Sequence, residues 1–507
     1  MGAEVSTPRP LTKFPSLNTL PLSLERKRAM SKGRCTCGNP LYMDSTEFGS
    51  GRRSSVKIQP ADEKLFQKVM EIMKPFELSV NQYNHFCDLM SETMDKGLKF
   101  ATHQEASIKM YPTYVSKIPD GTVESGDYLA LDLGGTNYRV LLVHFSGKST
   151  LPRIEERTYA VPHSKMSGTG EELFDYIAKT LADFLKSHGV AEKRCDLGFT
   201  FSFPCEQKGL TDAVLVRWTK GFSATGVTGQ NVAQLLQDAI DRAGANAQCV
   251  AVVNDTVGTL ASCALEDPRC AVGLIVGTGT NAAYVERSEN VQLMDDKSNE
   301  FVVINTEWGA FGEAGEFNAL RTQFDKSVDT ESINPGKQLF EKMISGMYLG
   351  EIVRHILVYL VQEKLLFRGE MPEKFLIKDA IATKYLTEVE RDPPHLSYRA
   401  HYMLTEDLEV RVVEPIDDRI VRYVCEVVTK RAAYLVGAGI ACLLRRMKRK
   451  EVTVGIDGSL YKFHPRFCER MTDIIDKLKP EDSRFHLRLS EDGSGKGAAA
   501  IAAAATR

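Results

Sequence analysis

The sequence predicts a mixed α/β protein with two lobes. Three observations support this fold class: apolar strand-like runs alternate with amphipathic helical segments, a strand-and-turn pattern occurs twice, and a long, mostly helical stretch separates the second pattern from a late strand. With 507 residues, the chain is about three times as long as a common single domain, so more than one structural unit is expected.

The first 59 residues are predicted to form a flexible basic tail. Residues 1–60 contain ten Lys or Arg against four Asp or Glu, and their many Ser, Pro and Gly residues show no sustained periodicity. The formal net charge of the whole chain is only −3, which disfavours a nucleic-acid-binding protein. A hydrophobic content of 43% excludes disorder over the whole length.

The N-terminus raises the question of membrane association. The start from Met1 to Ser6 fits the N-myristoylation pattern at Gly2, and the basic residues within 25–28 would provide a weak second membrane signal. The alternative is an unmodified tail, because such short patterns also arise by chance. No apolar run approaches the ~20 residues of a membrane-spanning helix, so no transmembrane segment is expected.

The cysteines favour a cytoplasmic location. Eleven of them are scattered along the chain without the spacing of a disulfide framework, so most are expected to be small buried apolar groups in a reduced setting. Cys35 and Cys37 form the one close pair. A C-x-C without a second pair nearby is a poor zinc motif, so a structural role is expected for both.

Regular structure is predicted to begin near residue 60. Apolar residues at helical spacing predict one helix around 65–73 and a second around 86–90. Two strand-like runs at 128–133 and 138–143 then flank a Gly-Gly turn, which predicts a β-hairpin. An amphipathic helix is predicted over 171–186, and a strand follows over 197–203.

A second strand-and-turn pattern resembles the first. Strands are predicted over 249–253 and 271–276, and the latter ends in the turn 277–279. Thr280-Asn281 follows Thr136-Asn137 at an offset of 144 residues, which indicates a duplicated α/β unit. Residues 336–445 are mostly helical in pattern, a further strand is predicted over 452–457, and the last helix, 495–506, is expected to return to the first lobe.

Three glycine turns at strand ends suggest a phosphate site. Glycine lets backbone N–H groups approach phosphate oxygens closely, and two of the turns begin with an aspartate, Asp132 and Asp457, whose carboxylate suits Mg²⁺ or its waters. The alternative is three ordinary hairpins, which need glycine for conformational reasons alone. The P-loop and protein-kinase motifs do not occur, so those two routes to phosphate binding are disfavoured.

Polar residues within the apolar strands and turns suit a sugar, because carboxylates accept hydrogen bonds from hydroxyls while amides and Lys donate to them. These residues are Ser202, Thr219, Lys220, Asn254, Asp255, Asn281, Glu307 and Glu341. Asp255 follows a strand and would take a hydroxyl proton during phosphoryl transfer. The alternative is that Asn254 and Asp255 merely cap the following helix, and the sequence does not separate the two.

Long segments in the same order resemble the eukaryotic hexokinase family over roughly residues 60–507. They are YLALDLGGTNYRVLLV (128–143), LGFTFSFPCEQKGL (197–210), WTKGF (218–222), VVNDTVGTL (252–260), GLIVGTGTNAAYVE (273–286), EWGAFG (307–312), NPGKQLFEKMISGMYLGE (334–351), VGIDGSLYKFHP (454–465) and LSEDGSGKGAA (489–499). The chain length is similar to that of single-unit members rather than duplicated ones.

The resemblance implies an actin-like ATPase (ribonuclease H-like) fold, with two lobes around a substrate cleft. It divides the chain after the tail into an N-terminal part, 60–262, and a C-terminal part, 263–507. The small lobe would span about 122–254 and be completed by helix 495–506, whereas the large lobe would include the helices of 60–120. Hinges are expected near 254–258 and 491–497.

The resemblance also implies roles for individual residues. The catalytic residues would be Asp255 as general base, Lys220 and Arg139. The sugar would contact Ser202, Thr219, Lys220, Asn254, Asp255, Asn281, Glu307 and Glu341. The nucleotide side would comprise Asp132, Gly134, Gly135, Thr136, Asn137, Arg139, Thr278, Gly458 and Ser459, and Asp132 would hold Mg²⁺ through water.

The implied activity is that of a hexokinase, with ATP and Mg²⁺ as cofactors. Such an enzyme transfers the γ-phosphoryl group of MgATP to the 6-hydroxyl of glucose and related aldohexoses, which is the first step of glycolysis. One alternative is a catalytically dead sugar sensor, against which the presence of Asp132, Lys220 and Asp255 argues. Another is a chaperone-like or filament-forming ATPase of the same fold, which has no reason to keep the sugar-binding residues.

Overall fold

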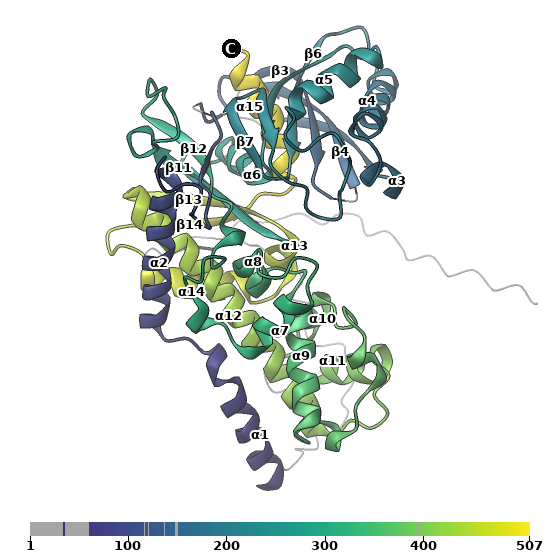
Figure 1. Cartoon of the computed structure of the whole chain (residues 1–507), viewed down its shortest axis with the longest axis vertical. Coiled ribbons are helices and arrows are strands. Elements are labelled where there is room, and N and C mark those ends of the chain that lie inside the picture. Colours follow the sequence, from purple (N-terminus) through teal and green to yellow (C-terminus); the bar gives the residue numbers. More distant parts are fainter. Residues whose placement is uncertain are drawn as a thin grey trace, which may run out of the picture. The chain divides into compact units, whose positions relative to one another are not determined.

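The computed structural model describes residues 34–35, 60–115, 117–119, 121–135, 137–147, 151–393 and 396–507 (Figure 1). Gly2, Cys37 and most of the predicted tail lie outside these residues, as does Thr136 of the first glycine turn. The backbone of Arg34–Cys35 forms β1, which pairs in parallel with β14 (Arg484–Leu489). These two residues therefore differ from the irregular tail predicted for 1–59.

A five-stranded sheet follows the first helices. Its strand order is β5-β4-β3-β6-β9, and its central strand β3 is antiparallel to β4 but parallel to β6. The bounds are β3 Ser125–Leu133, β4 Asn137–Ser146, β5 Arg153–Ala160, β6 Cys195–Phe201 and β9 Ala247–Val253. The predicted hairpin and the predicted strands 197–203 and 249–253 are thereby confirmed to within a few residues at their ends.

The second sheet repeats this order. The strand order of this seven-stranded sheet is β1-β14-β13-β10-β11-β12-β2. Its segment β12-β11-β10-β13-β14 and the five-stranded sheet share one order, in which the five strands, numbered as they occur along the chain, lie as third, second, first, fourth and fifth. β10 is antiparallel to β11 and parallel to β13, as β3 is to β4 and β6. The shared topology agrees with the duplication predicted from the offset of 144 residues. The bounds are β2 Tyr111–Pro112, β10 Cys270–Val276, β11 Thr280–Arg287, β12 Phe301–Asn305 and β13 Glu451–Asp457.

Helices cover both faces of the five-stranded sheet. On one face, the side chains of Leu129 and Leu131 pack in an apolar cluster with α4 (Gly170–Ser187) and α5 (Val232–Arg242). On the other face, Ala130 contributes to the larger core, which includes α15 (Gly493–Ala505). The alternation of β3 side chains between two apolar faces explains why its sequence reads as continuously hydrophobic.

The helices that follow β9 and β14, α6 (Asp255–Ala264) and α15, pack against each other (Figure 1). Their contact has no room for side chains, because a Cβ atom on Gly497 would lie 1.8 Å from the carbonyl oxygen of Gly258. α6 also packs on β10 and β13, so the α6–α15 contact joins the two sheets. The boundary predicted between residues 262 and 263 falls within α6 and marks no break in regular structure.

The remaining helices form the rest of the seven-stranded side, called here the large lobe; the five-stranded sheet with α4, α5 and α15 is called the small lobe. The long helices are α1 Pro60–Met73, α2 Val80–Leu98, α9 Leu349–Gln362, α12 Pro415–Met447 and α14 Phe467–Leu478. The short ones are α7 Gln323–Glu331, α8 Leu339–Ile344, α10 Thr383–Val389, α11 Tyr398–Tyr402 and α13 Ser459–Phe463. The short helix α3 His163–Met166 packs against α4 and belongs to the small lobe. A small hairpin, β7 Cys205–Gly209 and β8 Asp212–Leu215, completes the fold.

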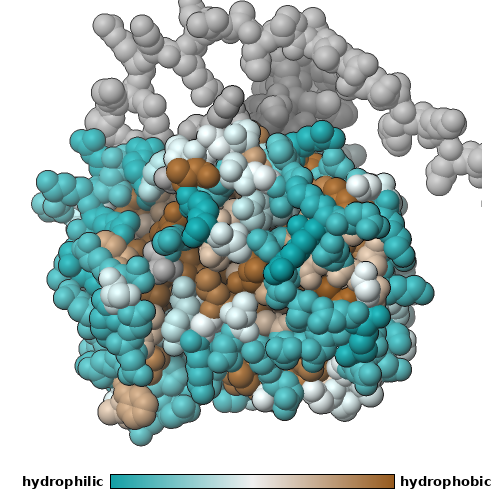
Figure 2. Space-filling model, turned by 90° about the horizontal axis from the view of Figure 1, so that it is seen from above, coloured by the Kyte–Doolittle hydropathy of each residue, from teal (hydrophilic) through white to brown (hydrophobic). Residues whose placement is uncertain are grey.

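Helix α12 lies among α2, α9 and α14. By length and composition, it is the one helix in the described part of the chain that is apolar enough to cross a membrane, although 89% of its most apolar window is buried inside the fold. Its hydrophobic surface is therefore used for packing against neighbouring helices. Figure 2 shows the surface from above, where hydrophilic residues surround hydrophobic ones grouped toward the middle.

Candidate active site

The candidate active site lies where strands of both sheets end in glycine turns. Gly134 directly follows β3, and Ser202 directly follows β6. A Cβ atom on Gly134 would lie 3.2 Å from the hydroxyl oxygen of Ser202. Gly277 follows β10, and a Cβ atom there would lie 3.5 Å from the Cα atom of Gly458, which follows β13. Carboxyl ends of neighbouring parallel strands thus place the first turn beside Ser202 and the second turn beside the third.

Glycine is required at position 458. Its φ of 124° lies in a region that side-chain-bearing residues avoid, and a Cβ atom would lie 2.2 Å from the carbonyl oxygen of Val276. Gly135 differs, because a Cβ atom there would meet nothing within 4 Å. The turn after β13 is therefore fixed by close packing at Gly458, whereas Gly135 in the turn after β3 has room for a side chain among the described residues.

Three side chains of the predicted sugar site form one hydrogen-bonded network with Asn305. The amide nitrogen Nδ2 of Asn281, at the start of β11, lies 3.0 Å from Oε1 of Glu307 and 3.5 Å from Oδ1 of Asn254. The same Nδ2 lies 2.8 Å from Oδ1 of Asn305, whose own Nδ2 donates to Glu307 at 2.8 Å. Asn305 was not predicted, although a polar residue that ends the apolar strand β12 is a usable signal.

Glu307 is held in an unusual backbone conformation. Its φ of 55° is left-handed, and it precedes the short helix Trp308–Ala310. Burial raises the pKa of its carboxyl group, and the nearby charge of Asp255 acts in the same direction. A half-buried carboxylate that already accepts two amide donors remains a strong acceptor for a further hydroxyl group.

Glu341, on α8, lies on the other side of the turn 277–279. Its Oε2 atom accepts the backbone N–H of Thr280 at 2.9 Å, and burial raises the pKa of its carboxyl group to about 7. A Cβ atom on Gly279 would lie 2.5 Å from this oxygen, so glycine makes room for the carboxylate. Gln338, which precedes α8 with a φ of 52°, packs its amide against Gly309.

Asp255 begins α6. Asn254 is the N-cap of this helix and accepts the N–H of Thr256 at 3.0 Å, so one of the two residues does cap the helix. Oδ1 of Asp255 accepts the same N–H at 2.9 Å, whereas its Oδ2 lies 4.0 Å from Nζ of Lys220. One oxygen therefore serves the helix start, as the capping alternative predicts, whereas the other lies near Lys220.

Lys220 joins the small-lobe residues to Asp255. Its backbone is left-handed, with a φ of 56°, and its Nζ donates to the carbonyl oxygen of Ser202 at 3.0 Å. Thr219 directly precedes it in the loop after β8. The structure therefore brings Ser202, Lys220 and Asp255 together, with Thr219 beside them.

Arg139 does not lie with Lys220 but forms a separate cluster. Its Nη2 pairs with Oδ2 of Asp132 at 2.7 Å and its Nη1 with Oδ1 of Asp492, also at 2.7 Å. Burial opposes the charge of Arg139, but Asp132 and Asp492 more than offset it and raise its pKa. Ser494 donates to Oδ2 of Asp132 at 2.7 Å. Asp492 and Ser494 were not among the predicted site residues, since nothing local to 491–497 shows its proximity to β3.

A cavity of about 420 Å³ adjoins the second and third turns. Its walls come from α10 and α13, and Thr278 and Ser459 line it. The backbone N–H of Gly346 donates to the carbonyl oxygen of Gly277 at 2.7 Å, which fixes one edge of the cavity to the second turn. Asn137 opens β4 near the first turn and is exposed.

A second cavity, of about 260 Å³, adjoins Glu307 and is lined by Arg217 and Pro204 from the other sheet's side.

Two hexokinase family models match the chain, over residues 68–265 and 271–504. A hexokinase of Schistosoma mansoni is 68% identical over 447 residues, which cover 88% of this chain and 99% of that protein. This chain belongs to the hexokinase family. It is 46% identical to human Hexokinase-2 over 473 residues, which are 92% of this chain and 51% of the human protein.

Solved structures of the family confirm the predicted fold class. The Schistosoma mansoni hexokinase solved in complex with glucose superposes with a TM-score of 0.83 and covers 87% of this chain and 99% of that one. A second hexokinase crystal structure, 31% identical, gives a TM-score of 0.76 and covers 88% of this chain and 100% of that one. The actin-like ATPase fold predicted from the motifs is therefore the fold of this family member.

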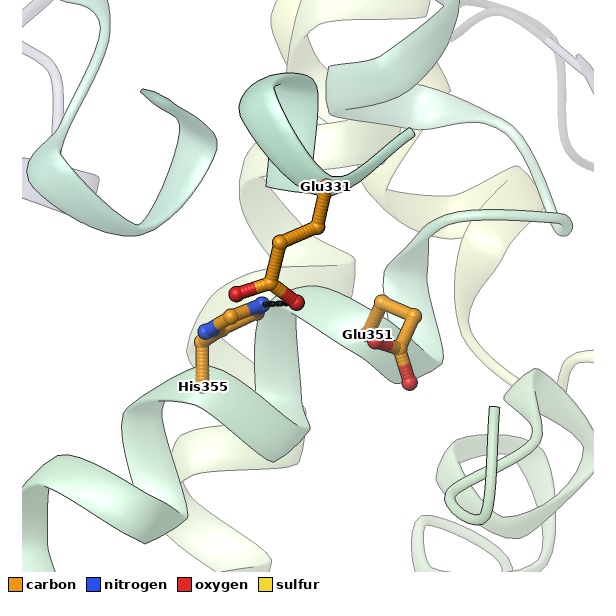
Figure 3. Close-up of side chains that lie close together, drawn as sticks. All are labelled: Glu331, Glu351 and His355. Atoms are coloured by element: carbon orange, nitrogen blue, oxygen red, sulfur yellow. Dashed lines mark ion pairs between the residues drawn. The ribbon is translucent and has the colours of Figure 1, made fainter. Parts of the chain in front are cut away.

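One cluster of metal-ligating side chains lies elsewhere in the described part of the chain. Ligand atoms of Glu331, Glu351 and His355 lie within 4.8 Å of one another, and Figure 3 shows the Glu331 carboxylate facing the His355 ring. However, the guanidinium of Arg354 lies 3.2 Å from Glu331 and 2.8 Å from Glu351. Arg354 shares its single positive charge between the two carboxylates, and the His355 ring also contacts Glu331, so we interpret the cluster as an ion-pair network between α7 and α9.

Proposed function

We propose that this chain transfers the γ-phosphoryl group of MgATP to the 6-hydroxyl of glucose and related aldohexoses, and releases hexose 6-phosphate and ADP. The observation that carries the proposal is the convergence of Asp255, Lys220 and the Asn281–Glu307 network beside three glycine turns. The glucose complex of a relative 68% identical to this chain supports glucose as the sugar.

Recognition of the sugar follows from the donors and acceptors of the site. Carboxylates of Glu307 and Glu341 accept from sugar hydroxyls, whereas the amide of Asn254 and the ammonium of Lys220 donate to them. Asn281 and Asn305 fix Glu307 in place before the sugar arrives, which lowers the ordering cost on binding. Ser202 and Thr219 contribute hydroxyl groups from the small-lobe side.

Asp255 is the proposed general base. Its Oδ2 faces the site while its Oδ1 is tied to the helix, so the carboxylate is oriented toward a substrate hydroxyl. Phosphoryl transfer has a loose transition state that needs little basic assistance, so Asp255 mainly orients the 6-hydroxyl and takes its proton late. Lys220, 4.0 Å away, offsets negative charge on the transferring group.

The nucleotide side is proposed at the three turns and the cavity beside them. Backbone N–H groups at Gly134, Gly135, Thr278 and Gly458–Ser459 would contact phosphates, while the cavity of about 420 Å³ would receive the rest of the nucleotide. Burial raises the pKa of the Asp457 carboxyl, and Asp492 and Asp132 add to this effect, so a cation fits here. Asp132 and Asp457 would hold hydrated Mg²⁺, which neutralises phosphate charge when it is bound.

Arg139 would act after a rearrangement. Asp132 and Asp492 hold it here, so its role toward the transferring phosphoryl group requires that these pairs exchange for phosphate oxygens. We propose that the lobes close around the sugar with hinges near 254–258 and 491–497. Closure would exclude water, which otherwise competes with the sugar as the acceptor.

Product analysis tests the proposal. Purified protein with MgATP and glucose should form equimolar ADP and glucose 6-phosphate, with little ADP when glucose is omitted. A sugar sensor without catalysis would bind glucose and release no ADP, whereas an ATPase of the same fold would release ADP at the same rate without glucose. Either of the latter results would reject the hexokinase activity.

The tail carries a separate proposal. N-myristoylation at Gly2 and a weak membrane association stay predictions, because Gly2 lies outside the described residues. The cytoplasmic location also stays a prediction. Intact-mass measurement of protein from a host that acylates N-termini would detect the added acyl chain. An unmodified mass would reject acylation at Gly2.

A further inference from the structure

Two walls of the cavity beside the glycine turns end at a single buried carboxylate. One wall is α10, whose Thr383, Lys384 and Thr387 line the cavity, and the other is α13, which contributes Leu460 and Phe463. Glu390 directly follows α10, and His464 directly follows α13. Nε2 of His464 lies 3.2 Å from Oε1 of Glu390, so the two walls are joined at their ends.

Glu390 is tied to the core helices as well. Arg470, on α14, donates from Nη2 to Oε2 of Glu390 at 2.6 Å and from Nη1 to Oε1 at 3.2 Å. Thr429, on α12, donates its hydroxyl to Oε1 of Glu390. The side chains of Glu390 and His464 are 1% and 0% exposed, so the group is fully enclosed.

The hydrogen bonds assign the protonation of this group. The backbone N–H of Arg466 donates to Nδ1 of His464 at 3.2 Å, so Nδ1 is unprotonated and Nε2 carries the hydrogen that Glu390 accepts. Although burial acts in the opposite direction, His464 and Arg470 lower the pKa of Glu390 to about 2. Glu390 is therefore ionised and balances the charge of Arg470.

The far end of α10 is anchored too. The hydroxyl of Thr383, the first residue of α10, donates to the carbonyl oxygen of Gly346 at 2.6 Å, next to the second glycine turn. α10 thus connects that turn to the Glu390 group, and a change at its end would move a whole wall. None of the predicted sugar-binding side chains forms a hydrogen bond to Glu390, His464, Arg470 or Thr429 in the described part of the chain.

We propose that Glu390 is a positioning residue that fixes both walls of the nucleotide cavity and thereby sets nucleotide affinity separately from sugar affinity. The proposal rests on the proposed function, because it assumes that this cavity receives the nucleotide. Replacement of the carboxylate by an amide removes the charge that balances Arg470 and turns one of the two acceptor oxygens into a donor, so that buried donors of Arg470 and His464 compete for the oxygen that remains. The ends of α10 and α13 would separate while the sugar site keeps its geometry.

The test is Glu390→Gln in the full chain, assayed with MgATP and glucose. The KM for ATP should rise about 10- to 100-fold, the range expected when a remote change misplaces a site by roughly an ångström. The KM for glucose should stay within about twofold of the parent value, as should kcat at saturating ATP, because the change affects binding of only one substrate.

Asp325→Asn is the matched control. Like Glu390, Asp325 is a buried carboxylate paired with an arginine: its Oδ1 lies 2.6 Å from Nη2 of Arg431, on α12. Neither Arg431 nor the other bonded partner of Asp325, Thr322, lines the cavity. It should lower stability to a similar extent and leave both KM values unchanged. Equal increases in the ATP KM for the two variants, or equal increases for both substrates in Glu390→Gln, would show a general structural role and overturn the proposal.

A second variant covers a failure to fold. If Glu390→Gln does not accumulate as folded protein, His464→Gln keeps an amide donor near the position of Nε2 and should raise the ATP KM in the same direction but less. An unchanged ATP KM in this folded variant would overturn the proposal. If the parent protein itself does not form glucose 6-phosphate, the proposed function fails, and this result is distinct from a failure of the Glu390 variants.

Discussion

Asp255 uses its two carboxylate oxygens differently, because one accepts a hydrogen bond at the helix start and the other lies near Lys220. Its position after an apolar strand was predicted, but its double use was not, because the sequence does not show that Lys220 approaches its second oxygen. The same applies to Arg139, whose partner Asp492 is more than 350 residues away along the chain. Residue types at the site were thus predictable from motifs, whereas pairings between distant segments were not.

Asp255→Asn should remove the general base while it preserves the helix start. The amide oxygen can still accept the N–H of Thr256, so the fold should be retained. General-base catalysis typically contributes 10²–10⁴-fold, so kcat should fall by about that factor. Steady-state kinetics would measure the fall in kcat, with Asp238→Asn as the control because Asp238 is an exposed carboxylate on α5. A kcat within about tenfold of the parent value would remove Asp255 from the base role.

Glu307→Ala should weaken glucose binding and leave ATP binding unchanged. The substitution removes the acceptor of the Asn305 amide and one acceptor of the Asn281 amide, and it removes one acceptor from the sugar. The cost of such unpaired buried groups is about 1–3 kcal/mol, which corresponds to about 5- to 150-fold in affinity. Calorimetric titration with glucose would measure the change, and an unaltered affinity would contradict the assignment of Glu307 to the sugar.

Glu341 gives glucose binding a dependence on pH. Burial raises its pKa to about 7, Thr280, Lys220 and Lys342 favour its ionised form, and Glu307 opposes ionisation. Sugar hydroxyls donate to the ionised carboxylate, so binding is linked to loss of its proton, and the KM for glucose should fall as pH rises through about 7. In the sugar-free protein the sign is reversed: because the folded pKa is raised above 4.5, ionisation of Glu341 costs stability as pH rises toward 7.

Glucose KM values across the pH range would test this linkage. Glu341→Gln has no carboxyl group to titrate at that position, so its glucose KM should be higher than that of the parent and much less dependent on pH. A weaker dependence should remain, because burial also raises the pKa of Glu307. An identical pH profile for the parent protein and Glu341→Gln would contradict the role of Glu341.

At the scale of elements, most strands and helices were predictable, but their order in the sheets was not. Alternation and periodicity identified β3, β4, α4 and β10, since these signals are local. The parallel pairs β3–β6 and β10–β13 join strands far apart in the sequence, and no local pattern specifies which strands meet. The repeat of one glycine turn at an offset of 144 residues was the one sequence signal of the shared topology.

Gly497→Ala should disrupt the contact between α6 and α15. The new methyl group would lie 1.8 Å from the carbonyl oxygen of Gly258, where backbone rather than a flexible side chain must move. Overpacking of this kind costs about 1–3 kcal/mol of unfolding free energy. Denaturant unfolding would measure the loss, with Gly209→Ala as control because a Cβ atom there meets nothing nearer than 3.9 Å. Equal stability of the two variants would show that the helices separate freely.

For the whole molecule, the proposed sugar site is divided between the small lobe and the large lobe. Ser202 and Lys220 belong to the five-stranded side, whereas Asn281, Glu307 and Glu341 belong to the seven-stranded side, and Asp255 begins the helix that joins them. A sugar that contacts both sets must therefore link the two lobes. We therefore expect the lobes to close on sugar binding, because a sugar between them would draw both sets of donors and acceptors together.

The two tryptophans of the chain allow closure to be followed in solution. Trp218 lies two residues before Lys220, partly buried against Phe203 and Phe222, whereas Trp308 follows Glu307 and is fully buried. Because closure changes the surroundings of the partly buried Trp218 indole more than those of the fully buried Trp308, glucose should alter the emission of the parent protein and of Trp308→Phe. Trp218→Phe should lose most of the change. If glucose binds by calorimetry without any change in the emission of the parent protein, the lobes do not move around Trp218, and water must be excluded from the site without closure there.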